Sequence, residues 1–194
     1  QHLAYRDGQS ELQELDRMRA SVNRIVSSTN EIALIAMTAA SDEEPATEAG
    51  GDTKGEAVEQ EEALIKTATA DFRAAATQME QQTPASIAWL AQAGPAFDEL
   101  IEVNTALGDE INRATHSTEA IFELKEKQEE AEMAILEKIG TERDRVIASM
   151  QAGANTLADS FVNLRRYAVV GGILAGLILL ASNLYIGRRV GGMF

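Results

Sequence analysis

The sequence predicts an all-α protein: an antiparallel up-down four-helix bundle whose last helix continues into a transmembrane helix. Apolar residues recur at spacings of three and four along four segments, the pattern of helices packed in a bundle. Good helix formers dominate these segments, while proline is scarce and aromatic residues make up only 5% of the chain. Residues 167–186 carry no charge, and a stretch of about 20 such residues is what a helix needs to span a bilayer.

The first helix is predicted over residues 3–40 from a heptad seam, a stripe of apolar residues along one face. The seam is formed by Leu15, Met18, Val22, Ile25, Thr29, Ile32 and Ala36. Val26, Leu34 and Ile35 widen the stripe beyond a two-stranded seam, as a helix inside a bundle requires.

A loop is predicted over residues 41–55, where Pro45 and three glycines interrupt the apolar pattern. Thr53 and Glu56 have the spacing of a capping box, so the second helix is expected from about residue 56 to 82. Its seam contains Phe72 and Met79.

Thr83 and Pro84 together predict the start of a third helix, because a threonine oxygen can cap it and proline is tolerated at its first position. Gly94 and Pro95 should kink or interrupt this helix, which is expected to reach about residue 115. Residues 115–118 form the next break.

The last helix is predicted from Glu119, because no proline follows before the apolar stretch. The predicted organisation is a helical bundle over 1–164, a transmembrane helix over 165–187 and a short segment over 188–194. The first and last residues also favour the expectation that this is a piece of a longer protein with a preceding span.

The apolar stretch has the flanks of a membrane span. Basic and aromatic residues sit where interface anchors are found: Arg165, Arg166, Tyr167, Tyr185, Arg188 and Arg189. Ala168, Gly172 and Gly176 make one face small, which favours close packing against another span. Because two arginines flank each end, charge does not decide the orientation.

Composition excludes several classes of function. The formal net charge is −14, and all 31 acidic residues precede the span, so this surface repels nucleic acid. No cysteine is present, and the two histidines, His2 and His116, are expected at opposite ends of the bundle. With no catalytic motif either, no catalytic residue, metal site, cofactor or enzymatic activity is expected.

Polar residues within the seams are the candidate ligand contacts. Thr29 and Asn104 occupy core positions in about the same layer, near Gln128, and such a layer can border a pocket. Equally, a polar core residue can fix the register of helices. Arginines could pair with an anionic group; the candidates are Arg17, Arg24, Thr29, Asn104 and Arg143.

A long bundle, a continuous membrane helix and the ending GRRVGGMF together resemble the sensor half of bacterial transmembrane receptors. These are the methyl-accepting chemotaxis proteins and sensor histidine kinases, whose span leads into a HAMP domain. Arg188, Arg189 and Val190 match the basic pair and apolar residue that open a HAMP domain. Met193 stands where proline would be expected, and Phe194 where an apolar core residue follows.

The resemblance implies a homodimer in the cytoplasmic membrane, with residues 1–164 in the periplasm and an output domain beyond residue 194. A small molecule or a protein would be the ligand, and cytoplasmic partners would bind only that output domain. Any kinase or cyclase activity would also lie there. The alternative is a membrane-anchored bundle that tethers other proteins. The sequence names no ligand, and chemoreceptors, kinases and cyclases share this plan.

Overall fold

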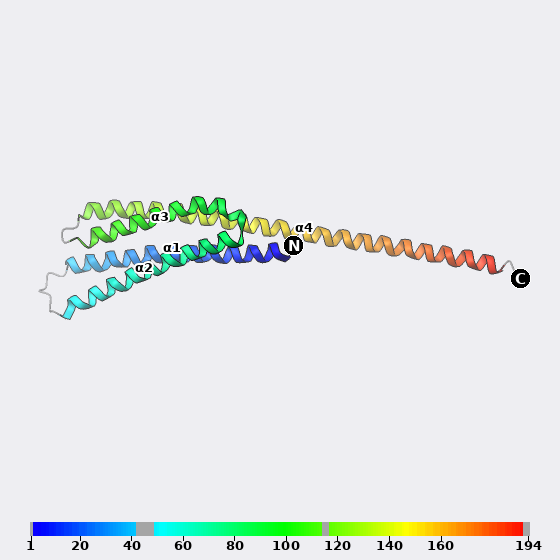
Figure 1. The fold of residues 1–194 in the computed structure, drawn as a ribbon, viewed down its shortest axis with the longest axis horizontal. Helices are drawn as coiled ribbons and strands as arrows, with labels where there is room; N and C mark the ends of the chain where they lie inside the picture. The colour runs from blue at the N-terminus through cyan, green and yellow to red at the C-terminus, as the bar shows by residue number, and fades with distance from the viewer. Residues whose placement is uncertain (1, 42–48, 114–116, 192–194) are drawn as a thin grey trace. The chain divides into compact units, whose positions relative to one another are not determined.

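The structure, a computed structural model, describes residues 2–41, 49–113 and 117–191. Within these ranges it consists of α-helices and one short 3-10 helix, with no strand, so the all-α prediction is confirmed (Figure 1). The elements are α1 (His2–Ser41), α2 (Ala49–Gln82), η1 (Pro84–Ser86), α3 (Ile87–Ile111) and α4 (Thr118–Gly191). The chain divides into two compact units, Gln1–Ala148 and Ser149–Phe194, which are described separately.

The first helix has nearly the predicted bounds, but α2 begins at Ala49, seven positions before the expected start. The loop predicted for 41–55 is therefore wrong over residues 49–55, and Pro45 lies outside the described residues. Glycine weakens a helix by about 1 kcal/mol relative to alanine but does not by itself end one. None of the described glycines has a positive φ, so none provides a helix stop.

The junction between α2 and α3 is held by the backbone. Thr83 is extended (φ −135°, ψ 92°), and Pro84 opens η1, but the Thr83 side chain makes no capping hydrogen bond. The predicted hydroxyl cap is therefore wrong. Instead, the Thr83 N–H donates to the Met79 carbonyl at 2.9 Å, and the Ser86 N–H donates to the Thr83 carbonyl at 2.9 Å.

Pro95 does not interrupt the third helix, because α3 runs through it to Ile111, four residues short of the predicted end. Proline costs a helix one backbone hydrogen bond. Here the residues that follow it, Ala96 and Phe97, are buried and pack the helix into the core.

Ser117 starts α4 close to the predicted break. Its Oγ accepts a hydrogen bond from the Ala120 N–H at 3.3 Å, the third position of the helix, which is the geometry of an N-cap. Its own N–H donates to Glu110 Oε1 at 3.1 Å, which ties the start of α4 to the end of α3.

The core of the first unit follows the predicted seams. Apolar side chains from all four helices are buried, and the largest of them include Leu15, Met18, Ile25, Met79, Phe97, Leu107, Ile135 and Ile139. Phe72 of α2 and Phe97 of α3 stack with ring centroids 3.6 Å apart and an interplanar angle of 1°. Each such burial contributes about 1.5–3 kcal/mol, so these seams hold the helices together.

Polar contacts connect the same helices within this unit. Ser10 near the start of α1 donates to Gln82 at the end of α2 (2.6 Å). The indole N–H of Trp89, early in α3, donates to the Lys138 carbonyl of α4 at 2.9 Å. Lys125 in α4 donates to Asn30 in α1. In Figure 1, α1 lies beside α2, and α3 lies beside the first part of α4, to which two of its side chains are hydrogen-bonded.

The second unit consists of the remainder of α4 over its described residues. Within Thr118–Leu180 one segment is long and apolar enough to cross a membrane by length and composition, with a mean hydropathy of 1.4. None of that segment is buried by the rest of the chain. Its exposed leucines, isoleucines and valines therefore suit a lipid surface or another helix.

Candidate functional site

Three polar side chains form a buried layer between α1, α3 and α4. Thr29, Asn104 and Gln128 are only 1%, 5% and 1% exposed. Gln128 Nε2 donates to Asn104 Oδ1 at 2.6 Å, and Asn104 Nδ2 donates to the Leu100 carbonyl at 2.7 Å. Thr29 Oγ1 donates to the Ile25 carbonyl at 2.9 Å. We call these three residues the amide layer.

Two hollows lie beside the amide layer, between α1, α2 and α3. The first has a volume of about 200 Å³ and is lined by Thr29, Asn104 and isoleucines from all three helices. The second, of about 400 Å³, shares Ile32, Glu62 and Asn112 with the first and extends to Val58 and Glu59. We call the two together the interhelical groove. Sequence reasoning placed Thr29 and Asn104 in one layer, and the structure brings both to this groove.

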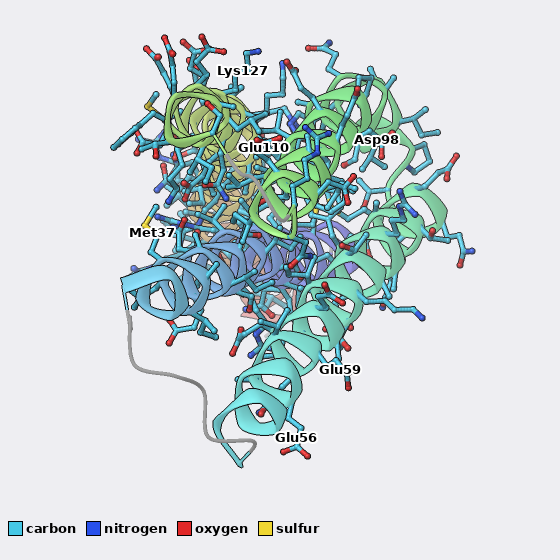
Figure 2. All side chains as sticks on the ribbon, turned by 90° about the vertical axis from the view of Figure 1, so that its left-hand side faces the viewer. Met37, Glu56, Glu59, Asp98, Glu110 and Lys127 are labelled. Atoms are coloured by element: carbon cyan, nitrogen blue, oxygen red, sulfur yellow. The ribbon has the colours of Figure 1, made fainter. Side chains whose placement is uncertain are left out.

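Acidic residues border the interhelical groove. Glu62 of α2 and Asp109 of α3 line the first hollow, and Glu59 lines the second. All three are exposed, and none of the described residues that line the groove is lysine or arginine. Figure 2 looks onto this end of the unit, with Met37 near the end of α1 and Glu56 and Glu59 near the start of α2. The groove thus combines an apolar floor with a negative border.

A second polar cluster is charged. Arg145 of α4 donates through Nε and Nη2 to both carboxylate oxygens of Glu142 at 2.8 Å each, and through Nη2 to Glu11 Oε1 at 2.9 Å. The Ser86 hydroxyl donates to the same Glu11 oxygen. Glu11 and Glu142 are 6% and 4% exposed, whereas the Arg145 side chain is 43% exposed. We call these four residues the carboxylate network.

Arg145 stays charged in this network. The hydrogen bond with Glu142 raises the pKa of the guanidinium, burial lowers it, and the charges of Glu142 and Glu11 raise it further, so the net shift is upward. Because the pKa of this cation is raised in the folded chain, the stability that its charge gives to the fold is fully present at every pH below the usual pKa of arginine. Ordinary pH changes therefore do not remove the Arg145 charge.

Sequence reasoning missed the carboxylate network, although a signal was present. The seam that contains Leu15 and Met18 extends back to position 11, and the seam that contains Ile139 and Val146 passes through position 142. The predicted seams were built mainly from apolar residues and included neither glutamate. The heptad register would have placed both in the interior.

The three arginines that were predicted to contact a ligand do not line the groove. Arg17 pairs with Glu14 at 3.1 Å, and Arg143 approaches Asp16 at 3.8 Å. Both arginine side chains are 44% exposed, and Arg24 is exposed too. The structure therefore separates the three arginines from Thr29 and Asn104.

The predicted membrane residues belong to the second unit. Arg165, Arg166 and Tyr167 are exposed along α4, and a Cβ added at Gly172 or Gly176 would meet no atom within 4 Å. The side chains of Tyr185, Arg188, Arg189 and His2, and all of His116, lie outside the described residues. Ala168 is exposed as well, so the small face is open in the single chain.

Comparison with known proteins gives no family for this chain: no family model, no curated protein and no solved structure matches it with significant similarity. Function must therefore be argued from the geometry.

Proposed function

We propose that this chain is the ligand-sensing and signal-transmitting part of a bacterial chemoreceptor or sensor kinase. The observation that carries the proposal is α4, a single helix that contains Gln128 of the amide layer, Arg145 of the carboxylate network and the apolar segment of 167–186. A continuous helix that carries both buried polar clusters and an apolar segment can transmit a change in packing from a ligand site to a membrane.

The proposal includes an antiparallel up-down bundle. Ser10 near the start of α1 contacts Gln82 at the end of α2, which supports an antiparallel pair. Trp89 early in α3 contacts Lys138 of α4. Asn104 later in α3 contacts the earlier Gln128, so α3 and the first part of α4 also run in opposite directions. In such a bundle the groove forms where α1 ends and α2 begins. Residues 1–164 would stand in the periplasm, and 165–187 would cross the cytoplasmic membrane.

The route from groove to α4 runs through the amide layer. Asn104 lines the groove, and its carbonyl oxygen accepts the hydrogen bond from Gln128 of α4. A ligand that favours one position of Asn104 shifts the packing of α4 by its differential affinity for the two arrangements. The receptor acts as a homodimer whose spans meet at Ala168, Gly172 and Gly176, and an output domain beyond residue 194 receives the signal.

A hybrid receptor tests the proposal. The chain is joined after Phe194 to the cytoplasmic part of a histidine kinase, and phosphorylation is measured in membranes. Asn104→Leu and Gln128→Met should each change the basal output, because each alters the contact between α3 and α4. A proline at Ala158 should make the output insensitive to both, since it breaks α4 beyond the first unit.

Two outcomes of this experiment would contradict the proposal. A hybrid that responds to Gln128→Met equally well with and without Ala158→Pro would exclude transmission along α4. A hybrid whose output is unaffected by any substitution in the first unit would favour the tethering alternative. The exposed substitution Gln92→Met on α3 serves as the matched control, with no expected change.

A further inference from the structure

The interhelical groove has chemistry of its own, which the proposed function leaves open. Its floor is apolar, formed by Ile32 of α1, Ile65 of α2 and Ile101 of α3. The first hollow, about 200 Å³, is smaller than pockets for drug-sized molecules, which begin near about 300 Å³. The space suits a short apolar chain with one polar end.

The polar groups around this floor favour a donor rather than an acceptor. Thr29 lines the hollow, and its Oγ1 uses its hydrogen to donate to the Ile25 carbonyl, so towards a ligand this oxygen can only accept. No described residue donates to this oxygen, although Thr29 is only 1% exposed. Thr29 Oγ1 already has one hydrogen-bond partner, and its remaining lone pairs can accept an N–H group of a ligand.

Charge selects the kind of donor. Glu62 and Asp109 approach the same hollow from α2 and α3, and Glu59 adds a third carboxylate in the second hollow. An anion would need an arginine or lysine here, and the described lining offers none. A cation in the groove would be attracted to all three carboxylates.

We infer that the groove binds a small organic cation: a primary alkylammonium whose chain packs on the isoleucines and whose N–H groups reach Thr29, Glu62 and Asp109. This inference rests on the proposed function, since it names the ligand class of that same site. Binding draws α2 and α3 together through their carboxylates, next to the hydrogen bond that connects Asn104 to α4.

Binding of n-hexylammonium to the full chain in a neutral detergent tests this inference. Isothermal calorimetry and the thermal unfolding midpoint are the readouts, with hexanoate and 1-hexanol as probes of the same chain length. Hexylammonium should bind saturably and raise the midpoint, while the other two should bind at least tenfold more weakly. Raising the salt concentration should weaken hexylammonium binding.

Variants locate the bound cation. The double substitution Glu62→Gln/Asp109→Asn should weaken hexylammonium binding at least tenfold, and Thr29→Val should weaken it severalfold. Ile32→Trp should abolish it by filling the hollow. The double substitution Glu80→Gln/Glu99→Gln makes an equal charge change at exposed positions of α2 and α3 that do not line the groove, so it is the matched control and should have no effect. A normal midpoint without ligand shows that each variant is folded.

The outcomes separate the two proposals. Equal binding of hexanoate, no binding of hexylammonium, or unchanged binding to the double variant would overturn the inference. If 1-hexanol binds more tightly than hexylammonium and Ile32→Trp blocks it, the groove is a ligand site of another class, and the sensing proposal stands. If hexylammonium binds as expected but leaves the hybrid kinase unchanged, the ligand class holds and the sensing proposal fails.

Discussion

The amide layer and the carboxylate network both place polar groups inside apolar seams, but they differ in charge and in the space beside them. The amide layer is neutral, and a hollow of about 200 Å³ opens next to Thr29 and Asn104. The carboxylate network buries two carboxylates, and an arginine bridges them with three hydrogen bonds. A polar core residue therefore marks a candidate ligand site only when space adjoins it; otherwise it serves the fold.

The largest expected effect comes from breaking the carboxylate network. Arg145→Met leaves Glu11 and Glu142 buried without their cation, and removing one partner of a buried ion pair costs about 3–5 kcal/mol. The half-exposed position of Arg145 favours the lower end of that range. Urea unfolding followed by the fluorescence of Trp89, the single tryptophan, measures the loss.

Arg143→Met is the control for this change, two positions away on the same helix. Its partner Asp16 is exposed and 3.8 Å away, so the substitution should change the free energy of unfolding by less than about 1 kcal/mol. Equal losses from Arg143→Met and Arg145→Met would show that the network does not stabilise the fold.

A smaller effect is expected from opening the amide layer. Gln128→Met keeps the side-chain length but leaves Asn104 Oδ1 buried without a donor, which costs about 1–3 kcal/mol. The same unfolding experiment measures it, with exposed Gln92→Met as the control. A loss larger than that of Arg145→Met would reverse the contrast between the two clusters.

Replacing both amides sharpens the contrast further. When both partners of a buried hydrogen bond become apolar groups of similar shape, the change in stability can be nearly neutral. Asn104→Leu with Gln128→Met should therefore unfold at a urea concentration close to that of the unchanged chain, and recover most of the loss seen with Gln128→Met alone. Additive losses would mean that the two amides do not act as a pair.

The sequence was most informative where structure depends on local periodicity. The apolar seams and the positions of Thr29 and Asn104 follow from the heptad register, which neighbouring residues define. The carboxylate network was missed because the seams were traced mainly through apolar residues, which left out Glu11 and Glu142. The early start of α2 was missed because glycines weaken a helix without ending it.

The sequence indicated the polar layer beside the groove but carried no signal for the size of the space. It depends on how far α2 lies from α1 and α3 where they border it, and periodicity specifies which face is buried but not how closely two faces approach. The same limit applies to the small face of Ala168, Gly172 and Gly176, because a Cβ added at either glycine meets no atom of the described residues within 4 Å.

A small gain in stability is expected in the stretch of α4 between the two clusters, where Gly140 lies. A Cβ added there would meet no atom within 4 Å, so Gly140→Ala creates no clash. Alanine should stabilise the helix by up to about 1 kcal/mol, because glycine loses more backbone freedom on folding. Urea unfolding should show this gain when Gly140→Ala is introduced into the unchanged chain. The same gain is expected in the Arg145→Met and Gln128→Met variants, because the effect is local to the backbone. A gain that disappears in either variant would mean that Gly140 couples the amide layer to the carboxylate network, which would support the proposed transmission along α4.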